Sequence, residues 1–135
     1  MLFTCTIENA DIEFGVFNGD KLLFEARLAT SRERSSDEYA ILIHSIFQLN
    51  RIAPASVSGA IMASVVRPLN DILTQAIEKL MNIKPLIVGP GVKTGLNIKT
   101  DIPSQVGADI VANAVAAGLV SKGPLVIIDF GTATT

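Results

Sequence analysis

Apolar positions interspersed with polar ones at the start of the chain predict an antiparallel β-meander. Leu2–Ile7, Ile12–Phe17 and Lys21–Leu28 are short apolar segments of this kind. An Asn-Gly pair lies in the intervening segment 18–20, and Asn-Gly between two strand-like runs is a strong hairpin signal. We therefore expect three antiparallel strands within residues 1–28.

A helical pattern begins after a polar loop over residues 30–36. Ser35 and Glu38 form a Ser-x-x-Glu capping box. The apolar residues that follow recur at intervals of three and four, as on one face of a helix. A second helix is expected from Pro68, because proline suits a first helical turn, and a third over Ser104–Val120. Buried strands are expected at Val57–Val65, Pro85–Val88 and Leu125–Ile128.

The predicted elements follow the order β-β-β-α-β-α-β, a loop over 89–102, and then α-β. A meander followed by alternating helices and strands forms a mixed sheet with helices on its faces. The predicted class is α/β, with the order used by actin-like and ribonuclease-H-like domains, the superfamily of acetate and sugar kinases.

Composition narrows the class of protein. Hydrophobic residues make up 49% of the 135 residues and charged residues 18%, as expected for a globular chain of one domain or slightly more. The net charge of −2 argues against nucleic acid or an anionic membrane as the main partner. One cysteine, Cys5, excludes an internal disulfide, and no signal peptide or 18-residue apolar run is present. We expect a cytoplasmic protein.

Two acidic residues are candidates for chemistry. Asp109 follows Gly107 and Ala108 at the start of a predicted helix, where a carboxylate can deprotonate a substrate hydroxyl. It can equally serve only to favour the positive end of its helix. Asp129 follows a predicted buried strand and can coordinate a cation, unless this segment is simply a surface turn.

Several motifs together resemble type III pantothenate kinases. The segment GPGVKTGLNIKTDIPSQVGADIVANAVAA (89–117) resembles the central block of that family, and the ending VIIDFGTATT resembles its second phosphate loop. GVFNGDKLLFEARLAT, SSDEYAILI and SVVRPL are similar to the family at the same spacings, so the resemblance covers the whole chain.

The resemblance implies two actin-like domains and a homodimer. The family transfers the γ-phosphate of ATP to the hydroxyl of pantothenate, the first step of coenzyme A synthesis. It uses Mg²⁺ with ATP and a monovalent cation, K⁺ or NH₄⁺. Residues 1–123 would form the first domain, and 124–135 the first strand and phosphate loop of a second. On that comparison we expect the chain to be truncated.

The resemblance also implies roles for individual residues. Asp109 would be the catalytic base, Asp129 would contact the cation, and the glycine-rich segment 89–95 would shape the pantothenate side of the cleft. The ATP-binding residues would be Thr6, Ile7, Glu8, Asn9, Ala10, Asp11, Ile12, Glu13 and Thr132. The substrate-binding residues would be Thr100, Gly107, Ala108, Asp109 and Ile110.

The chain departs from the family at its first phosphate loop. The family has Asp-x-Gly-Asn-Thr where this chain has Thr6–Ala10, and only Asn9 is retained. The aspartate that helps to hold the metal–ATP complex is replaced by Thr6, and the glycine by Glu8. Two like unit charges roughly 4 Å apart repel by about 4 kcal/mol at an effective dielectric of about 20. Glu8 should therefore oppose ATP binding.

Two further departures fall on the substrate side. Ile110 stands where the family has an arginine, which can bind a carboxylate in a bidentate fork. Thr100 stands where the family often has a tyrosine. From these changes we expect little or no kinase activity.

Two other interpretations remain open at this level. The chain can be a non-catalytic family member that acts as a regulatory or binding protein, such as an accessory factor for transcription. It can also be an isolated domain that self-associates through an unpaired strand at Leu125–Ile128.

Overall fold

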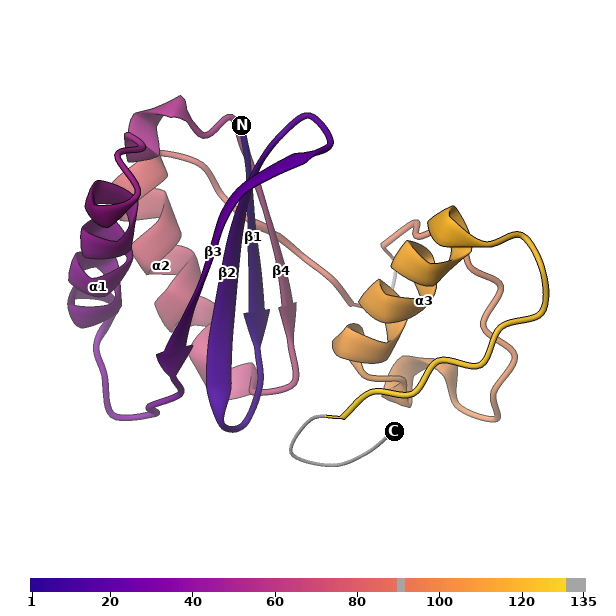
Figure 1. The fold of residues 1–135 in the computed structure, drawn as a ribbon. Helices are drawn as coiled ribbons and strands as arrows, with labels where there is room; N and C mark the ends of the chain where they lie inside the picture. Colours follow the sequence, from indigo (N-terminus) through magenta and orange to yellow (C-terminus); the bar gives the residue numbers. More distant parts are fainter. Residues whose placement is uncertain (90–91, 131–135) are drawn as a thin grey trace.

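A five-stranded mixed sheet forms the centre of the structure. The computed structural model describes residues 1–89 and 92–130. The sheet order is β3-β2-β1-β4-β5, with β1 antiparallel to β2 and parallel to β4 (Figure 1). This order confirms the predicted α/β class. The strands are β1 Leu2–Ile7, β2 Asp11–Asn18, β3 Lys21–Ala29, β4 Gly59–Ser64 and β5 Leu86–Ile87.

The predicted meander is present, and its turns together with one register shift in β2–β3 set the strand pairing. Asn18 pairs with Lys21 across a two-residue turn, in which Gly19 has a φ of 58°. A positive φ there suits glycine, which explains the Asn-Gly signal. Thr6 pairs with Glu13, and a one-residue register shift between Val16 and Phe17 brings Glu13 opposite Arg27. These three side chains therefore share one face of the sheet.

Three helices connect or follow the strands: α1 Ser36–Leu49, α2 Asn70–Met81 and α3 Ala108–Val120. The capping box is confirmed, because the Ser35 hydroxyl accepts a hydrogen bond from the Glu38 amide and the Glu38 carboxylate accepts one from the Ser35 amide. β4, α2 and α3 each begin later than predicted. A short 3₁₀ turn precedes each of them, at Pro54–Ser56, Arg67–Leu69 and Pro103–Gln105.

The core lies between the sheet and the helices α1 and α2. Both helices cover one face, while α3 lies beyond the other face and contacts β4 (Figure 1). Phe47 of α1 is fully buried and packs on two rings of the sheet, with centroid distances of 5.8 Å to Phe3 and 5.4 Å to Phe24. Tyr39 is also fully buried, and its hydroxyl donates to the carbonyl of Ser31 at 2.7 Å.

The predicted strand at Leu125–Ile128 is wrong. These residues form no strand, and all four side chains are exposed, Val126 to 88%. A strand needs a neighbouring backbone for its hydrogen bonds and a surface on which to bury its side chains. Within the described residues, no strand of the sheet pairs with this segment. Four apolar residues in a row were therefore not sufficient to form one.

No helix in the described part of the chain is both long and apolar enough to cross a membrane.

Truncation of Phe47 should destabilise the fold strongly. Phe47→Ala removes the ring that links α1 to the sheet, and the cost should be about 3–5 kcal/mol of unfolding free energy. Leu49→Ala is the matched control in the same helix, because Leu49 is 83% exposed, and its effect should stay within about 0.5 kcal/mol. Urea unfolding followed by circular dichroism measures both. Equal effects of the two substitutions would contradict this account of the core.

Candidate functional site

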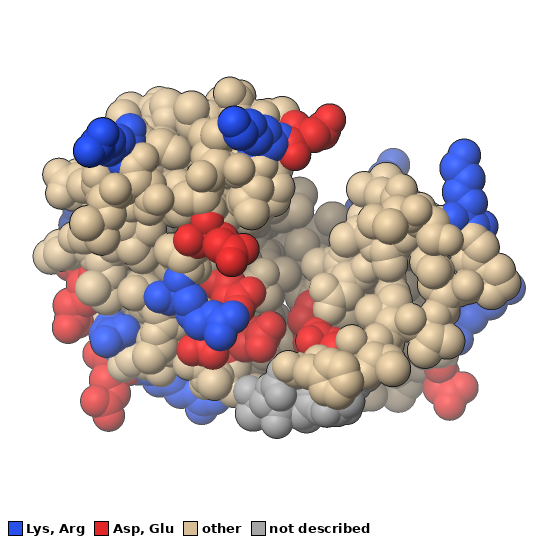
Figure 2. All heavy atoms as spheres, in the orientation of Figure 1, with Lys and Arg blue, Asp and Glu red and all other residues tan. Residues whose placement is uncertain are grey.

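A pocket of about 510 Å³ lies between the sheet and α3. One wall comes from β1, β2, β3 and the β1–β2 turn. The other comes from α3 and residues 129–130. Figure 2 shows acidic side chains on both sides of the hollow between these two parts of the molecule. The lining residues are Thr6, Glu8, Ala10, Asp11, Glu13, Arg27, Asp109, Ala112, Asn113, Asp129 and Phe130.

The β1–β2 turn forms one wall of this pocket and is tightly tied. The amide of Glu8 donates to the carbonyl of Asp11 at 2.9 Å, which closes a turn around residues 9 and 10. Thr30, just after β3, donates its hydroxyl to the Glu8 carbonyl at 2.7 Å and its amide to the Ala10 carbonyl at 2.8 Å. Because the Glu8 amide is already bonded within the turn, it is not free to bind a phosphate.

Asp109 lies on the opposite wall, in the first turn of α3. Gly107 precedes the helix as its N-cap and has no side chain to cap it. A Cβ at residue 107 would collide with Oδ1 of Asp109, so glycine is what allows this carboxylate to lie against the backbone. Oδ1 is buried and has no hydrogen-bond partner among the residues that the structure describes. A buried carboxylate oxygen of this kind is costly, and a role in catalysis or ion binding is one explanation for it.

Asp129 is held beside α3 by one hydrogen bond. The side-chain amide of Asn113 donates to its Oδ2 at 2.8 Å. Asn113 is four residues after Asp109, so both residues lie on the same face of α3. This face therefore brings Asp109 and Asp129 to one pocket, although 20 positions separate them in the sequence.

The pocket lining is strongly acidic. Five carboxylates line it, those of Glu8, Asp11, Glu13, Asp109 and Asp129, and Arg27 is the only lysine or arginine among the described lining residues. Arg27 forms an ion pair with Glu13 and approaches Asp11 at 3.8 Å.

The environment of Glu8 raises the pKa of its carboxyl group above the ordinary value. Partial burial removes water from the carboxylate, and this desolvation is the largest cause. The negative charges of Glu13, Asp129, Asp109 and Asp11 act in the same direction. The neighbourhood therefore disfavours the ionised form of Glu8.

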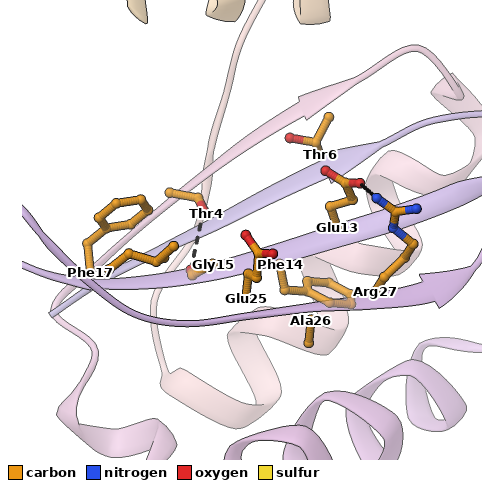
Figure 3. A pocket seen from close by; sticks show the side chains of 10 residues that line it. Thr4, Thr6, Glu13, Phe14, Gly15, Phe17, Glu25, Ala26 and Arg27 are labelled. Atoms are coloured by element: carbon orange, nitrogen blue, oxygen red, sulfur yellow. Dashed lines mark hydrogen bonds and ion pairs between the residues drawn. The ribbon is translucent and has the colours of Figure 1, made fainter. Parts of the chain in front are cut away.

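A second pocket of about 510 Å³ continues along the outer face of the meander, which is the face opposite to α1 and α2. It shares Thr6, Glu13 and Arg27 with the first pocket. Figure 3 shows the Glu13 carboxylate between Thr6 and the Arg27 guanidinium. Gly15 lies further along β2, and a Cβ there would come within 2.7 Å of the Thr4 hydroxyl oxygen.

The structure brings together only part of the predicted site. Thr6, Glu8, Ala10, Asp11, Glu13, Asp109 and Asp129 all line the first pocket. Ile7 and Ile12 are instead fully buried in the core, so their side chains face away from it. Other predicted residues are not among those that line the two pockets: Asn9, Thr100, Gly107, Ala108 and Ile110. Thr132 and residues 90–91 of the glycine-rich segment lie outside the described residues.

Sequence reasoning missed Arg27 and Asn113. Arg27 of β3 pairs with Glu13 of β2, and this pairing depends on a one-residue register shift between Val16 and Phe17 that the turn at Gly19 does not reveal. Asn113 has a local signal, the four-residue spacing from Asp109 on a helix. In the described residues, no group of three or more His, Cys, Asp or Glu side chains is arranged to hold a metal ion by itself.

The five-stranded mixed sheet, in the order β3-β2-β1-β4-β5, is consistent with an actin-like domain. A family model for type III pantothenate kinase matches residues 3–135, and the chain belongs to that family. The family binds pantothenate and ATP and uses Mg²⁺ with ATP.

Removal of the Glu8 carboxyl should change how stability depends on pH. A carboxyl with a raised pKa in the folded state binds a proton more readily there than in the unfolded chain. Its contribution to stability therefore falls as pH rises through the unfolded and then the folded pKa. Glu8→Gln should consequently gain stability relative to wild type as pH rises above about 4.3, the ordinary pKa of a glutamate.

Urea unfolding at several pH values in this range measures the difference. Glu25→Gln removes one negative charge from the exposed outer face and corrects for the change in net charge. A stability difference between Glu8→Gln and wild type that does not vary with pH would contradict the assignment.

Proposed function

We propose that this chain carries the substrate cleft of a pantothenate kinase in a form that binds ATP weakly. The observation that supports this most is the convergence of Glu8, Asp109 and Asp129 on one pocket from three separate parts of the chain. The family assignment supplies the reaction, the transfer of a phosphoryl group from ATP to the hydroxyl of pantothenate.

Asp109 is the proposed catalytic base. Its buried Oδ1 accepts no hydrogen bond from any described residue, which supports its availability to a substrate hydroxyl. In the reaction, the hydroxyl oxygen forms a bond to the γ-phosphorus and the bond from that phosphorus to the β–γ bridging oxygen breaks. The hydroxyl proton passes to Asp109 and ADP leaves. Positioning of the hydroxyl and stabilisation of charge supply most of the catalysis in such transfers.

The carboxylates of the pocket fit the cations that this chemistry requires. Oxygen ligands suit Mg²⁺, which proteins usually hold through one or two carboxylates together with substrate phosphates. Bound Mg²⁺ would neutralise phosphate charge. Asp129 is the proposed contact of the monovalent cation, K⁺ or NH₄⁺, and Asn113 would orient its carboxylate.

Weak nucleotide binding follows from the charge and shape of the pocket wall that the β1–β2 turn forms. Glu8 adds a carboxylate where a phosphate would approach the turn, and Arg27 is already paired with Glu13. We therefore propose little or no turnover.

The segment from residue 124 is proposed to begin a second actin-like domain, and the family comparison favours a cytoplasmic homodimer.

Release of ADP tests the proposed activity directly. The chain is incubated with pantothenate, ATP, Mg²⁺ and K⁺, and an active type III pantothenate kinase serves as positive control. We expect turnover at least about 100-fold below that control, because Glu8 replaces the family glycine with a side chain that obstructs and repels a phosphate. Turnover comparable to the control would show that the altered turn still holds ATP. If the chain is inactive but binds a protein partner, a regulatory function is favoured instead.

Restoration of the family residues should recover function stepwise. Glu8→Gly removes the repelling carboxylate and should raise ATP affinity about tenfold or more. Ile110→Arg should instead act on pantothenate affinity, because a guanidinium can bind its carboxylate. Both are measured by calorimetry, in the chain itself and in a chimera extended by the second domain of an active family kinase. Glu25→Gly is the control for Glu8→Gly, and an equal gain in ATP affinity from both would contradict the role of Glu8.

A further inference from the structure

Thr6, Glu13 and Arg27 form a row across three neighbouring strands. Thr6 is paired with Glu13, and Glu13 with Arg27, so their side chains point to the same side of the sheet. All three line both pockets, and Figure 3 shows the Glu13 side chain between Thr6 and Arg27. A carboxylate is therefore present beside residue 6, but it comes from the adjacent strand.

The residues of the pocket fit a divalent cation that arrives with a nucleotide. All the acidic groups supply oxygen ligands, and Oδ1 of Asp109 is buried without a partner in residues 1–89 and 92–130. The described residues contain no group of three ligands for a metal held by protein alone. This agrees with a metal that is held by one or two carboxylates and by substrate phosphates.

We propose that Glu13 is the metal-binding carboxylate of this cleft and replaces, from the neighbouring strand, the acidic group that Thr6 lacks. The inference rests on the proposed nucleotide site. In this proposal the Arg27 guanidinium forms an ion pair with the Glu13 carboxylate until the metal–nucleotide complex binds.

Glu13 suits this role better than the other carboxylates of the pocket. Asp129 is engaged by Asn113. Glu8 lies in the turn tied to Thr30, where its burial and its acidic neighbours oppose ionisation. Asp11 lies next to the turn, and its Oδ2 is 3.8 Å from Nη1 of Arg27. Glu13 is half exposed and already binds a cation, the Arg27 guanidinium, so exchange of this cation for a divalent ion requires only a side-chain movement.

Binding of Mn²⁺, followed by electron paramagnetic resonance, tests the proposal without an activity assay. Mn²⁺ takes oxygen ligands as Mg²⁺ does, and its free signal falls as it binds. The titration is made with and without ATP, in wild type and in the Glu8→Gly background. Glu13→Gln should weaken Mn²⁺ binding in the presence of ATP about tenfold or more, and Thr6→Asp should restore binding in the Glu13→Gln chain.

Two matched variants separate metal binding from a structural effect. Glu25→Gln removes an acidic group that lines only the second pocket, and it should leave Mn²⁺ affinity unchanged. Arg27→Gln breaks the same ion pair as Glu13→Gln but leaves the carboxylate, so Mn²⁺ affinity should be kept or raised. Equal losses from Arg27→Gln and Glu13→Gln would overturn the proposal, and so would an unchanged affinity in Glu13→Gln.

The titrations with and without ATP distinguish a failure of this inference from a failure of the proposed function. If the Glu8→Gly chain binds Mn²⁺ with ATP and Glu13→Gln has no effect there, only the assignment of Glu13 fails. If no variant binds ATP, the proposed nucleotide site fails, and titration with Mn²⁺ alone decides the assignment. A weaker affinity in Glu13→Gln would then support Glu13 as a metal ligand, and an unchanged affinity would overturn it.

Discussion

The central position of β1 in the sheet is the constraint on which the rest of the structure depends. β1 pairs antiparallel with β2 and parallel with β4, so it is held on both edges. Alternate side chains of β1 are buried against α1 and α2, and the others face the pockets. A shift of β1 by one residue would exchange these two sets. Burial of Phe3, Cys5 and Ile7 thus also determines that Thr6 faces the cleft.

Electrostatic repulsion within the cleft is the main conflict in this architecture. The start of α3 favours negative charge at Asp109, and the meander brings Glu8, Asp11 and Glu13 to the opposite wall. A site for a phosphorylated substrate ordinarily needs positive charge or a metal to balance such a set. Only Arg27 provides positive charge among the described lining residues, and it is paired with Glu13. Any anionic ligand of this pocket therefore depends on a cation that accompanies it.

The fold was predictable where the signals are local. The hairpin at Gly19 and the capping box at Ser35 each depend on neighbouring residues, and both are confirmed. Element boundaries were less predictable, because the 3₁₀ turns before β4, α2 and α3 contain residues that also suit a strand or helix. The segment Leu125–Ile128 was misjudged, since strand formation depends on a partner that no local pattern reveals.

The sequence by itself determined the order of the elements as far as α3 and the chemical identity of the altered residues. Glu8 and Asp109 could be named as candidate site residues from motifs alone, and both line the first pocket. Tertiary structure decided which side chains meet: it placed Ile7 and Ile12 in the core, brought Asp129 to Asn113 and paired Glu13 with Arg27. The physical reason is that capping and turn formation act within a few residues. The charge balance of the cleft depends instead on strand register and on the packing of α3, which join residues about 100 positions apart.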